Sequence, residues 1–344
     1  MGEKLLINSA IYALIVFLSF ILSKKLKLED IPDQSRKIHI LPISYAGGMS
    51  ISLYFLFLIN INNFDIHLEN ILLCSFLIFV TGMIDDKINI KPSTKLLLII
   101  LPILILIYLG IFIDNLGQYE KIGILNLGKF KYIFCILCVL LVINAVNYID
   151  GIDGLALSQT IISLIYLLFL TNNKDIIFYI YCLLIPFSIN LLFNFNFFGK
   201  IKFFLGNSGS LVIGFVLSFL VIFLAKFEGI HPSYLIWSLF FYVYEFLSVN
   251  IVRILNKKSL FEAGKDHIHH ALFYLFKESH YKTTFSLSIF SVIVIYLSYL
   301  INSLSNLLSL SLFIIMFFVY FLIRIKIFNK YKIIMSQVYN NSNV

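Results

Sequence analysis

Eleven long apolar stretches dominate this sequence of 344 residues. A helix needs roughly 20 apolar residues to cross a hydrocarbon core about 30 Å thick, and each stretch approaches that length. The stretches run over about 5–23, 45–61, 70–85, 95–113, 132–147, 155–171, 176–194, 208–225, 233–252, 283–302 and 306–323. Charged residues make up only 13% of the chain, against roughly 25% in soluble domains. The pattern predicts an all-α, polytopic membrane protein of about 11 transmembrane helices in a single domain over 1–344. It excludes disordered proteins, collagens and soluble enzymes.

The distribution of basic residues predicts the orientation in the membrane. Of the 26 Lys and Arg residues, 20 fall in the loops after the first, third, fifth, seventh and ninth stretches and in the C-terminal tail. Basic residues accumulate on the cytoplasmic side, so we expect the N-terminus outside and the C-terminus in the cytoplasm. The net charge of +8 suits the lipid bilayer surface or an anionic substrate. Nucleic acid is not expected as a partner.

Two adjacent carboxylates, Asp85 and Asp86, end the third stretch. Adjacent carboxylates repel each other unless a cation lies between or beside them. Oxygen ligands at such a place suit Mg²⁺. A solvated helix end followed by a turn is the alternative, and for an isolated Asp-Asp pair it is the commoner arrangement.

A polar series ends the fifth stretch, where Asn144, Asn147, Asp150 and Asp153 recur every three residues. If the helix continues, they form one polar stripe, and two glycines beside them would let backbone amides approach an anion. No Lys or Arg lies in this loop, so an ion or ligand is the natural counter-charge. A turn built from two Asp-Gly pairs is the alternative. The two upstream asparagines favour a functional site.

Small polar residues open the eighth stretch, over 203–210. Free N–H groups at a helix N-terminus can bind phosphate, and the aromatic pair Phe203 and Phe204 could stack on a base. Lys202 adds positive charge. An ordinary cap made by Asn207 or Ser208 is the alternative.

Three histidines, His267, His269 and His270, lie in the long loop after the ninth stretch. Histidines at a membrane surface can bind phosphate or move a proton, and a transition-metal site is the alternative. Arg253 and two lysines precede them as an anion clamp or as lipid anchors. Together the four clusters predict a membrane enzyme that handles phosphates on the inner face with a divalent metal.

From about residue 30 to 275, the order of these motifs resembles the polyprenyl-phosphate N-acetylhexosamine-1-phosphate transferases. The most similar branch begins bacterial O-antigen, teichoic acid or related envelope glycans. The resemblance implies transfer of a HexNAc-1-phosphate, with GlcNAc-1-phosphate favoured, from a UDP-HexNAc to undecaprenyl phosphate with release of UMP. It implies Mg²⁺ as cofactor, with Mn²⁺ as an alternative, and the bacterial inner membrane with a cytoplasmic active site. A homodimer is left open.

The resemblance also implies roles for individual residues. The catalytic set is Asp85, Asp86, Asp150, Asp153 and His269; the substrate-binding set is Lys95, Asn144, Phe204, Arg253, His267 and His270; the metal-binding set is Asn147, Asn207 and Asp86. In addition, Asp33, Arg36, Lys37 and His39 resemble the first inner loop of the family.

Two departures from the family pattern stand out. Asn207 occupies the place of a usual Asp that binds metal, so Mg²⁺ affinity should fall unless neighbouring carboxylates compensate. Glu245 occupies the place of another usual Asp. A catalytically weakened or silent homologue that serves as a nucleotide- or lipid-binding scaffold is therefore the alternative to a transferase. A transporter is disfavoured, because the polar clusters lie at helix ends and not at mid-membrane.

Overall fold

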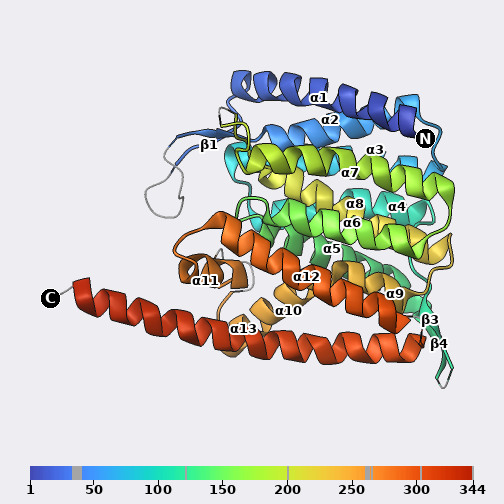
Figure 1. Cartoon of the computed structure of the whole chain (residues 1–344). Helices are drawn as coiled ribbons and strands as arrows, with labels where there is room; N and C mark the ends of the chain where they lie inside the picture. The colour runs from blue at the N-terminus through green and yellow to red at the C-terminus, as the bar shows by residue number, and fades with distance from the viewer. Residues whose placement is uncertain are drawn as a thin grey trace.

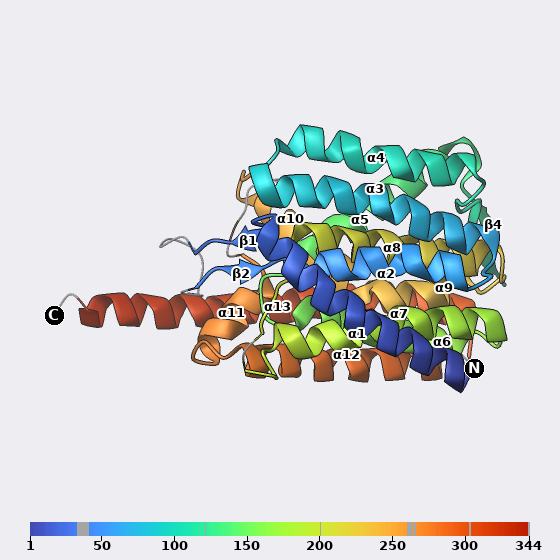
Figure 2. The same cartoon turned by 90° about the horizontal axis from the view of Figure 1, so that it is seen from above.

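The computed structural model describes residues 1–32, 41–120, 122–199, 201–259, 264, 266–302 and 304–342, with side chains as far as residue 334. The chain forms an elongated bundle of helices (Figures 1 and 2). The helices are α1 (Gly2–Lys25), α2 (Ala46–Ile61), α3 (Ile66–Ile88), α4 (Pro92–Tyr108), α5 (Lys131–Ile149), α6 (Leu155–Leu170), α7 (Lys174–Asn194), α8 (Gly206–Lys226), α9 (Pro232–Leu235), α10 (Phe240–Leu255), α11 (Ile268–Leu275), α12 (His280–Asn302) and α13 (Asn306–Ser342). The strands are β1 (Glu29–Asp30), β2 (Ile43–Ser44), β3 (Asn115–Tyr119) and β4 (Gly123–Asn126), and β1 pairs antiparallel with β2 as β3 does with β4.

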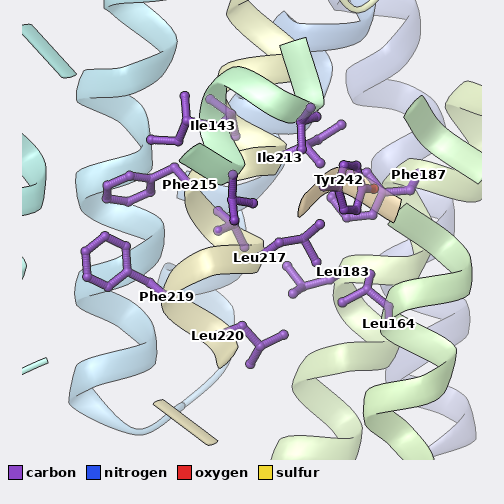
Figure 3. Close-up of a cluster of buried hydrophobic side chains, with 14 of the residues drawn as sticks. Ile143, Leu164, Leu183, Phe187, Ile213, Phe215, Leu217, Phe219, Leu220 and Tyr242 are labelled. Carbon is purple, nitrogen blue, oxygen red and sulfur yellow. The ribbon is translucent and has the colours of Figure 1, made fainter. Parts of the chain in front are cut away.

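Helix α8 forms the core of the bundle. It is buried along nearly its whole length and packs most extensively against α3 and α5. Figure 3 shows part of this core, with side chains of α8 among those of α5, α6, α7 and α10: Ile143, Leu164, Leu183, Phe187, Ile213, Phe215, Leu217, Phe219, Leu220 and Tyr242. A helix that is apolar on all sides is stable only when other helices or lipid surround it. Here other helices surround it, so α8 is the scaffold on which the rest is placed.

Glycines bring two helices close to the beginning of α8. A Cβ atom added at Gly82 of α3 would lie 2.5 Å from the Ser208 Cα, and one added at Gly48 of α2 would lie 2.4 Å from the Gly209 backbone nitrogen. No side chain fits at either position without a backbone shift. The glycines therefore place the polar ends of α2 and α3 directly against the first turn of α8.

The helices confirm the all-α class and a multi-pass membrane protein. Within the described ranges, seven helical segments are long and apolar enough to cross a membrane: α1, α5, α7, α8, the combined α9–α10 segment, α12 and α13. Helices α2, α4 and α6 are apolar but shorter, and α3 carries charged residues at its end. Each of the eleven predicted stretches overlaps helical structure, and the ninth covers α9, a 3₁₀ turn over Ile236–Leu239 and α10. The number of crossings and the orientation stay predictions, although the two termini lie at opposite ends of the bundle (Figure 1).

Three features differ from the sequence-based expectation. The fourth stretch ends at Tyr108, earlier than predicted, and the segment after it forms the β3–β4 hairpin. The histidines lie at the beginning of helix α11 and not in an open loop. Helix α13 has 37 residues and is therefore about 55 Å long, so it extends well past the end of the bundle that holds β1 and α11 (Figure 1).

Candidate active site

The first turn of α8 is capped by a carboxylate of another helix. The Asn207 backbone N–H donates to Asp86 Oδ1 at 2.8 Å, and the Ser208 N–H donates to Asp86 Oδ2 at 3.0 Å. The negative charge satisfies two helix-terminal amides and meets the positive end of the helix dipole. The expectation of free N–H groups for a phosphate is not met, because Asp86 already occupies them.

Beside this cap, Lys95 of α4 joins α3 to α8. Its Nζ lies 2.9 Å from Asp85 Oδ2 and donates to Asn207 Oδ1 at 3.4 Å. The same Asn207 oxygen accepts a hydrogen bond from Asn147 Nδ2 of α5 at 2.7 Å. Three helices, α4, α5 and α8, therefore meet at one amide oxygen, and α3 joins them through the Asp85–Lys95 ion pair. As a metal ligand, Asn207 would use an oxygen atom that already accepts two hydrogen bonds, whereas Asn147 takes part in this contact through its amide nitrogen.

The polar stripe predicted after α5 is not continuous. The helix ends at Ile149, so Asp150 and Asp153 lie in the turn that follows it. Upstream, Asn144 donates to a backbone carbonyl one turn earlier in its own helix at 2.7 Å. The structure therefore brings Asp150 and Asp153 to the site, whereas the Asn144 amide nitrogen is engaged within α5.

Asp150 carries the least compensated charge of the site. It is half-buried, and burial together with the carboxylates of Asp86 and Asp153 raises its pKa well above the ordinary value. The described basic side chains nearby pair with other carboxylates, at Asp85, Asp153 and Asp266. Asp150 is therefore a carboxylate that would gain from an incoming cation or proton.

The aromatic side chain next to the acidic loop is Phe204. Lys202 Nζ lies 2.6 Å from Asp153 Oδ2 and 5.2 Å from the centre of the Phe204 ring. Phe203, by contrast, is 1% exposed and stacks on Phe193 in the core. Phe204 is thus the partly exposed member of the aromatic pair.

The three histidines adjoin the acidic loop. The His269 ring centre lies 5.4 Å from that of His267 and 4.3 Å from that of His270. A Cβ atom added at Gly151 would lie 3.0 Å from His269 Nε2. Burial, followed by the charges of His270 and His267, lowers the His269 pKa well below its ordinary value, so its ring is neutral. Both ring nitrogens are buried without a hydrogen-bond partner in the described part of the chain. Such atoms indicate an absent ligand or water.

Arg253 pairs with Asp266, the residue just before the histidines. Its Nε and Nη2 atoms each donate to a carboxylate oxygen of Asp266 at 2.8 Å. Burial raises the Asp266 pKa, but these hydrogen bonds outweigh it and hold the pKa below the ordinary value. A cavity of about 580 Å³ lies beside the pair, between α10 and α13, and Lys258, Arg324 and Lys332 line it. This end of the bundle is therefore strongly basic next to an acidic loop.

The donor atoms fit a hard cation that binds together with a substrate. Among the described residues, no three His, Cys, Asp or Glu side chains are already spaced to hold an ion at once. Mg²⁺ commonly takes one or two protein carboxylates and completes its shell with water and substrate phosphates. Asp150, Asp153 and Asp86 lie close enough for their charges to interact, and together they supply such oxygen atoms.

Comparisons with known proteins place this sequence in a family. Residues 68–225 match the family described as glycosyl transferase family 4. The undecaprenyl-phosphate alpha-N-acetylglucosaminyl 1-phosphate transferase of Pasteurella multocida (strain Pm70) is 32% identical over 262 residues, which cover 73% of this chain and 72% of that protein.

The chain belongs to glycosyl transferase family 4.

Other relatives agree with this membership. The probable undecaprenyl-phosphate N-acetylglucosaminyl 1-phosphate transferase of Bacillus subtilis (strain 168) is 28% identical over 264 residues, with 72% of this chain and 69% of that protein covered. A Salmonella typhi protein named as the alpha-N-acetylglucosaminyl enzyme is 23% identical over 263 residues, with 74% and 71% covered. The residues that match the family include three parts of the site, namely the acidic helix ends, Lys95 and the beginning of α8. It does not include the histidines or α13.

Two asparagines that the sequence analysis did not single out hold the loops of the site together. Asn194 of α7 accepts a hydrogen bond from the Gly154 amide and donates to the Phe203 carbonyl at 3.2 Å. One turn earlier, Asn190 donates to the Gly47 carbonyl at 3.2 Å. Their spacing of four residues, which places both on one face of an otherwise apolar helix, could have indicated this role from the sequence.

One predicted group cannot be placed. Asp33, Arg36, Lys37 and His39 of the first inner loop lie outside the described residues.

Proposed function

We propose that this chain transfers a HexNAc-1-phosphate, with GlcNAc-1-phosphate as the favoured group, from a UDP-sugar to undecaprenyl phosphate and releases UMP. We place the reaction on the cytoplasmic face of a bacterial inner membrane. The names of the relatives support the acceptor and the sugar phosphate. The observation that carries the proposal is the acidic group Asp86, Asp150 and Asp153, which lies beside a buried neutral histidine at one end of a membrane bundle.

The reaction requires positive charge at that place. A phosphate oxygen of the lipid forms a bond to the β-phosphorus of the UDP-sugar while the bond from that phosphorus to the bridging oxygen breaks, and UMP leaves with the electron pair. Both reactants are anions, so fixed positive charge must screen their repulsion. Mg²⁺, when bound, supplies part of that charge at the diphosphate. Asp153 and Asp86 would hold it, which leaves Asp150 free of the metal.

The side chains of this chain supply the remaining functions. Phe204 offers a flat face to the uracil base. Lys202, which contacts both that ring and Asp153, places a positive charge at the diphosphate end of the nucleotide. His269 has two unused ring nitrogens, one donor and one acceptor in the neutral ring, for the sugar or its phosphate.

Asp150 is the proton acceptor in this proposal. Its raised pKa moves it towards the range in which a carboxylate can take a proton from a monoprotonated lipid phosphate. Asp86 is less suited to this role, because both of its oxygens accept backbone hydrogen bonds at the beginning of α8. Asp86 instead keeps α3 and α8 in register.

The test is turnover by the purified protein in nanodiscs with undecaprenyl phosphate and Mg²⁺. We expect UMP release from at least one member of a panel of UDP-HexNAc donors, and a lipid product whose mass gives the sugar. Asp150→Asn, which keeps the shape of the side chain and removes its charge, should lower kcat/KM for release by about 100-fold or more. Binding of UDP without turnover of any donor would exclude the transferase.

A catalytically silent scaffold is the second candidate function, and Asn207 favours it. Its amide oxygen is occupied by Lys95 and Asn147, and it lacks the charge that the family resemblance leads one to expect there. Asn207→Asp decides between the two. It should change an active enzyme little, whereas it should switch on a silent one.

A further inference from the structure

A buried carboxylate on α10 holds the helix that carries the histidines. Glu245 is 1% exposed. Its Oε1 atom accepts a hydrogen bond from the Ile268 backbone N–H at 2.8 Å and lies 3.4 Å from His267 Nδ1. Ile268 is the first residue of α11, and the preceding His267 makes no side-chain cap. Glu245 therefore caps α11 from a different helix.

The second oxygen of the same carboxylate is held by the terminal helix. Tyr320 Oη of α13 donates to Glu245 Oε2 at 2.6 Å, and Arg324 Nε lies 3.9 Å from that oxygen. Arg324 also donates through Nη2 to the Asp266 carbonyl. Tyr320 and Arg324 are each 2% exposed and lie one turn apart on one face of α13. The terminal helix thus reaches the histidine segment through two buried polar side chains.

We propose that Tyr320 and Arg324 of α13, acting through Glu245, are positioning residues that fix the histidines against the acidic loop. The catalytic consequence rests on the proposed function. Helices α10 and α13 are already joined without Glu245 and Arg324, because Tyr244 of α10 donates a hydrogen bond to the Phe313 carbonyl of α13. Burying a carboxylate and a guanidinium costs desolvation free energy unless both groups form further hydrogen bonds. Their further partners are the backbone of 266–268 and the His267 ring.

The first experiment measures the position of the histidines without using activity. Diethyl pyrocarbonate modifies neutral, accessible imidazole rings, and mass spectrometry gives the rate for each histidine. His269 is fully buried and should react slowly in the wild-type protein, whereas His231, at the other end of the bundle, serves as an internal reference. Tyr320→Phe and Glu245→Gln should each raise the rate at His269 relative to His231 by about ten-fold, as expected for losing one hydrogen bond to a charged group.

Tyr244→Phe is the matched control for that experiment. It removes one buried hydroxyl between the same two helices but does not touch Glu245, so the relative rate at His269 should stay at the wild-type value. An unchanged rate in both Tyr320→Phe and Glu245→Gln would overturn the proposal. An equal rise in Tyr244→Phe would overturn it as well, because it would show general loosening.

The second experiment measures the catalytic consequence. In Tyr320→Phe, kcat for UMP release should fall about ten-fold, while KM for the polyprenyl phosphate changes less than about two-fold, since misplaced catalytic groups act mainly on the chemical step. Wild-type kcat in this variant of an active enzyme would contradict positioning. If the wild-type protein turns over no donor, the proposed function fails, and the diethyl pyrocarbonate rates still decide whether α13 positions the histidines.

Discussion

Gly82→Ala adds a single methyl group where α3 meets the beginning of α8. The new Cβ atom would lie 2.5 Å from the Ser208 Cα, whereas ordinary contact begins at 3.4 Å, so the helices must separate by about 0.9 Å (3.4 − 2.5). Asp86 lies one turn further along α3. Its hydrogen bonds to α8, now 2.8 and 3.0 Å, would lengthen to roughly 3.7 and 3.9 Å, beyond hydrogen-bonding distance.

The expected effect of Gly82→Ala is large on catalysis and moderate on stability. A displacement of about 1 Å at catalytic groups can cost roughly 100-fold in rate, and overpacking typically costs about 1–3 kcal/mol of unfolding free energy. UMP release and thermal unfolding of the purified protein measure both. Gly2→Ala is the control, because an added Cβ meets no atom within 4 Å there. Wild-type kcat together with unchanged unfolding in Gly82→Ala would refute the close-packing argument.

Three further predictions concern charge. Asp150→Asn should lower kcat/KM by about 100-fold or more without lowering the unfolding temperature, since it removes an uncompensated charge; a fall in both would indicate a structural role. Chelation with EDTA should abolish UMP release, with recovery on added Mg²⁺ and, as the alternative ion, Mn²⁺; full activity in EDTA would exclude the metal. Because Arg253 outweighs burial and lowers the Asp266 pKa, the pair stabilises the fold above the ordinary carboxyl pKa of about 3.9, and this contribution is lost as pH falls through the lowered pKa. Asp266→Asn should therefore reduce the acid sensitivity of thermal unfolding, and an unchanged pH profile would argue against the pair.

The helices were predictable because a membrane imposes one length and one composition on every crossing. Each apolar stretch became a helix, and the polar clusters at the predicted inner ends gathered at one end of the bundle. Asp150 and Asp153 could be singled out because they continue the spacing of two asparagines at the end of an apolar span. Asp85 and Asp86 alone fit a solvated helix end as well, and they became candidates only together with the other clusters.

The partners of these side chains could not be predicted. A helix such as α8 that is apolar on all sides has no polar face to show which neighbours it meets. The cap that Asp86 makes on α8, the hydrogen bonds from Asn194 to two loops and the attachment of α11 to Glu245 all depend on how the helices pack. The end of α5 at Ile149 was likewise not visible, because the three-residue spacing of polar side chains continues past it.

The cap on α8 also bears on how the protein is made. Asp86 and the Asn207 amide that it binds are 121 residues apart, and at roughly 5–20 residues per second a ribosome needs about 6–24 s to span that distance. During that interval α3 has been made but α8, whose first turn Asp86 caps, has not. When α8 is made, the helices α2, α3 and α5 against which it packs are already present. The acidic part of the site therefore assembles only when α8 packs between helices made before it, and the histidine segment of α11 follows later still.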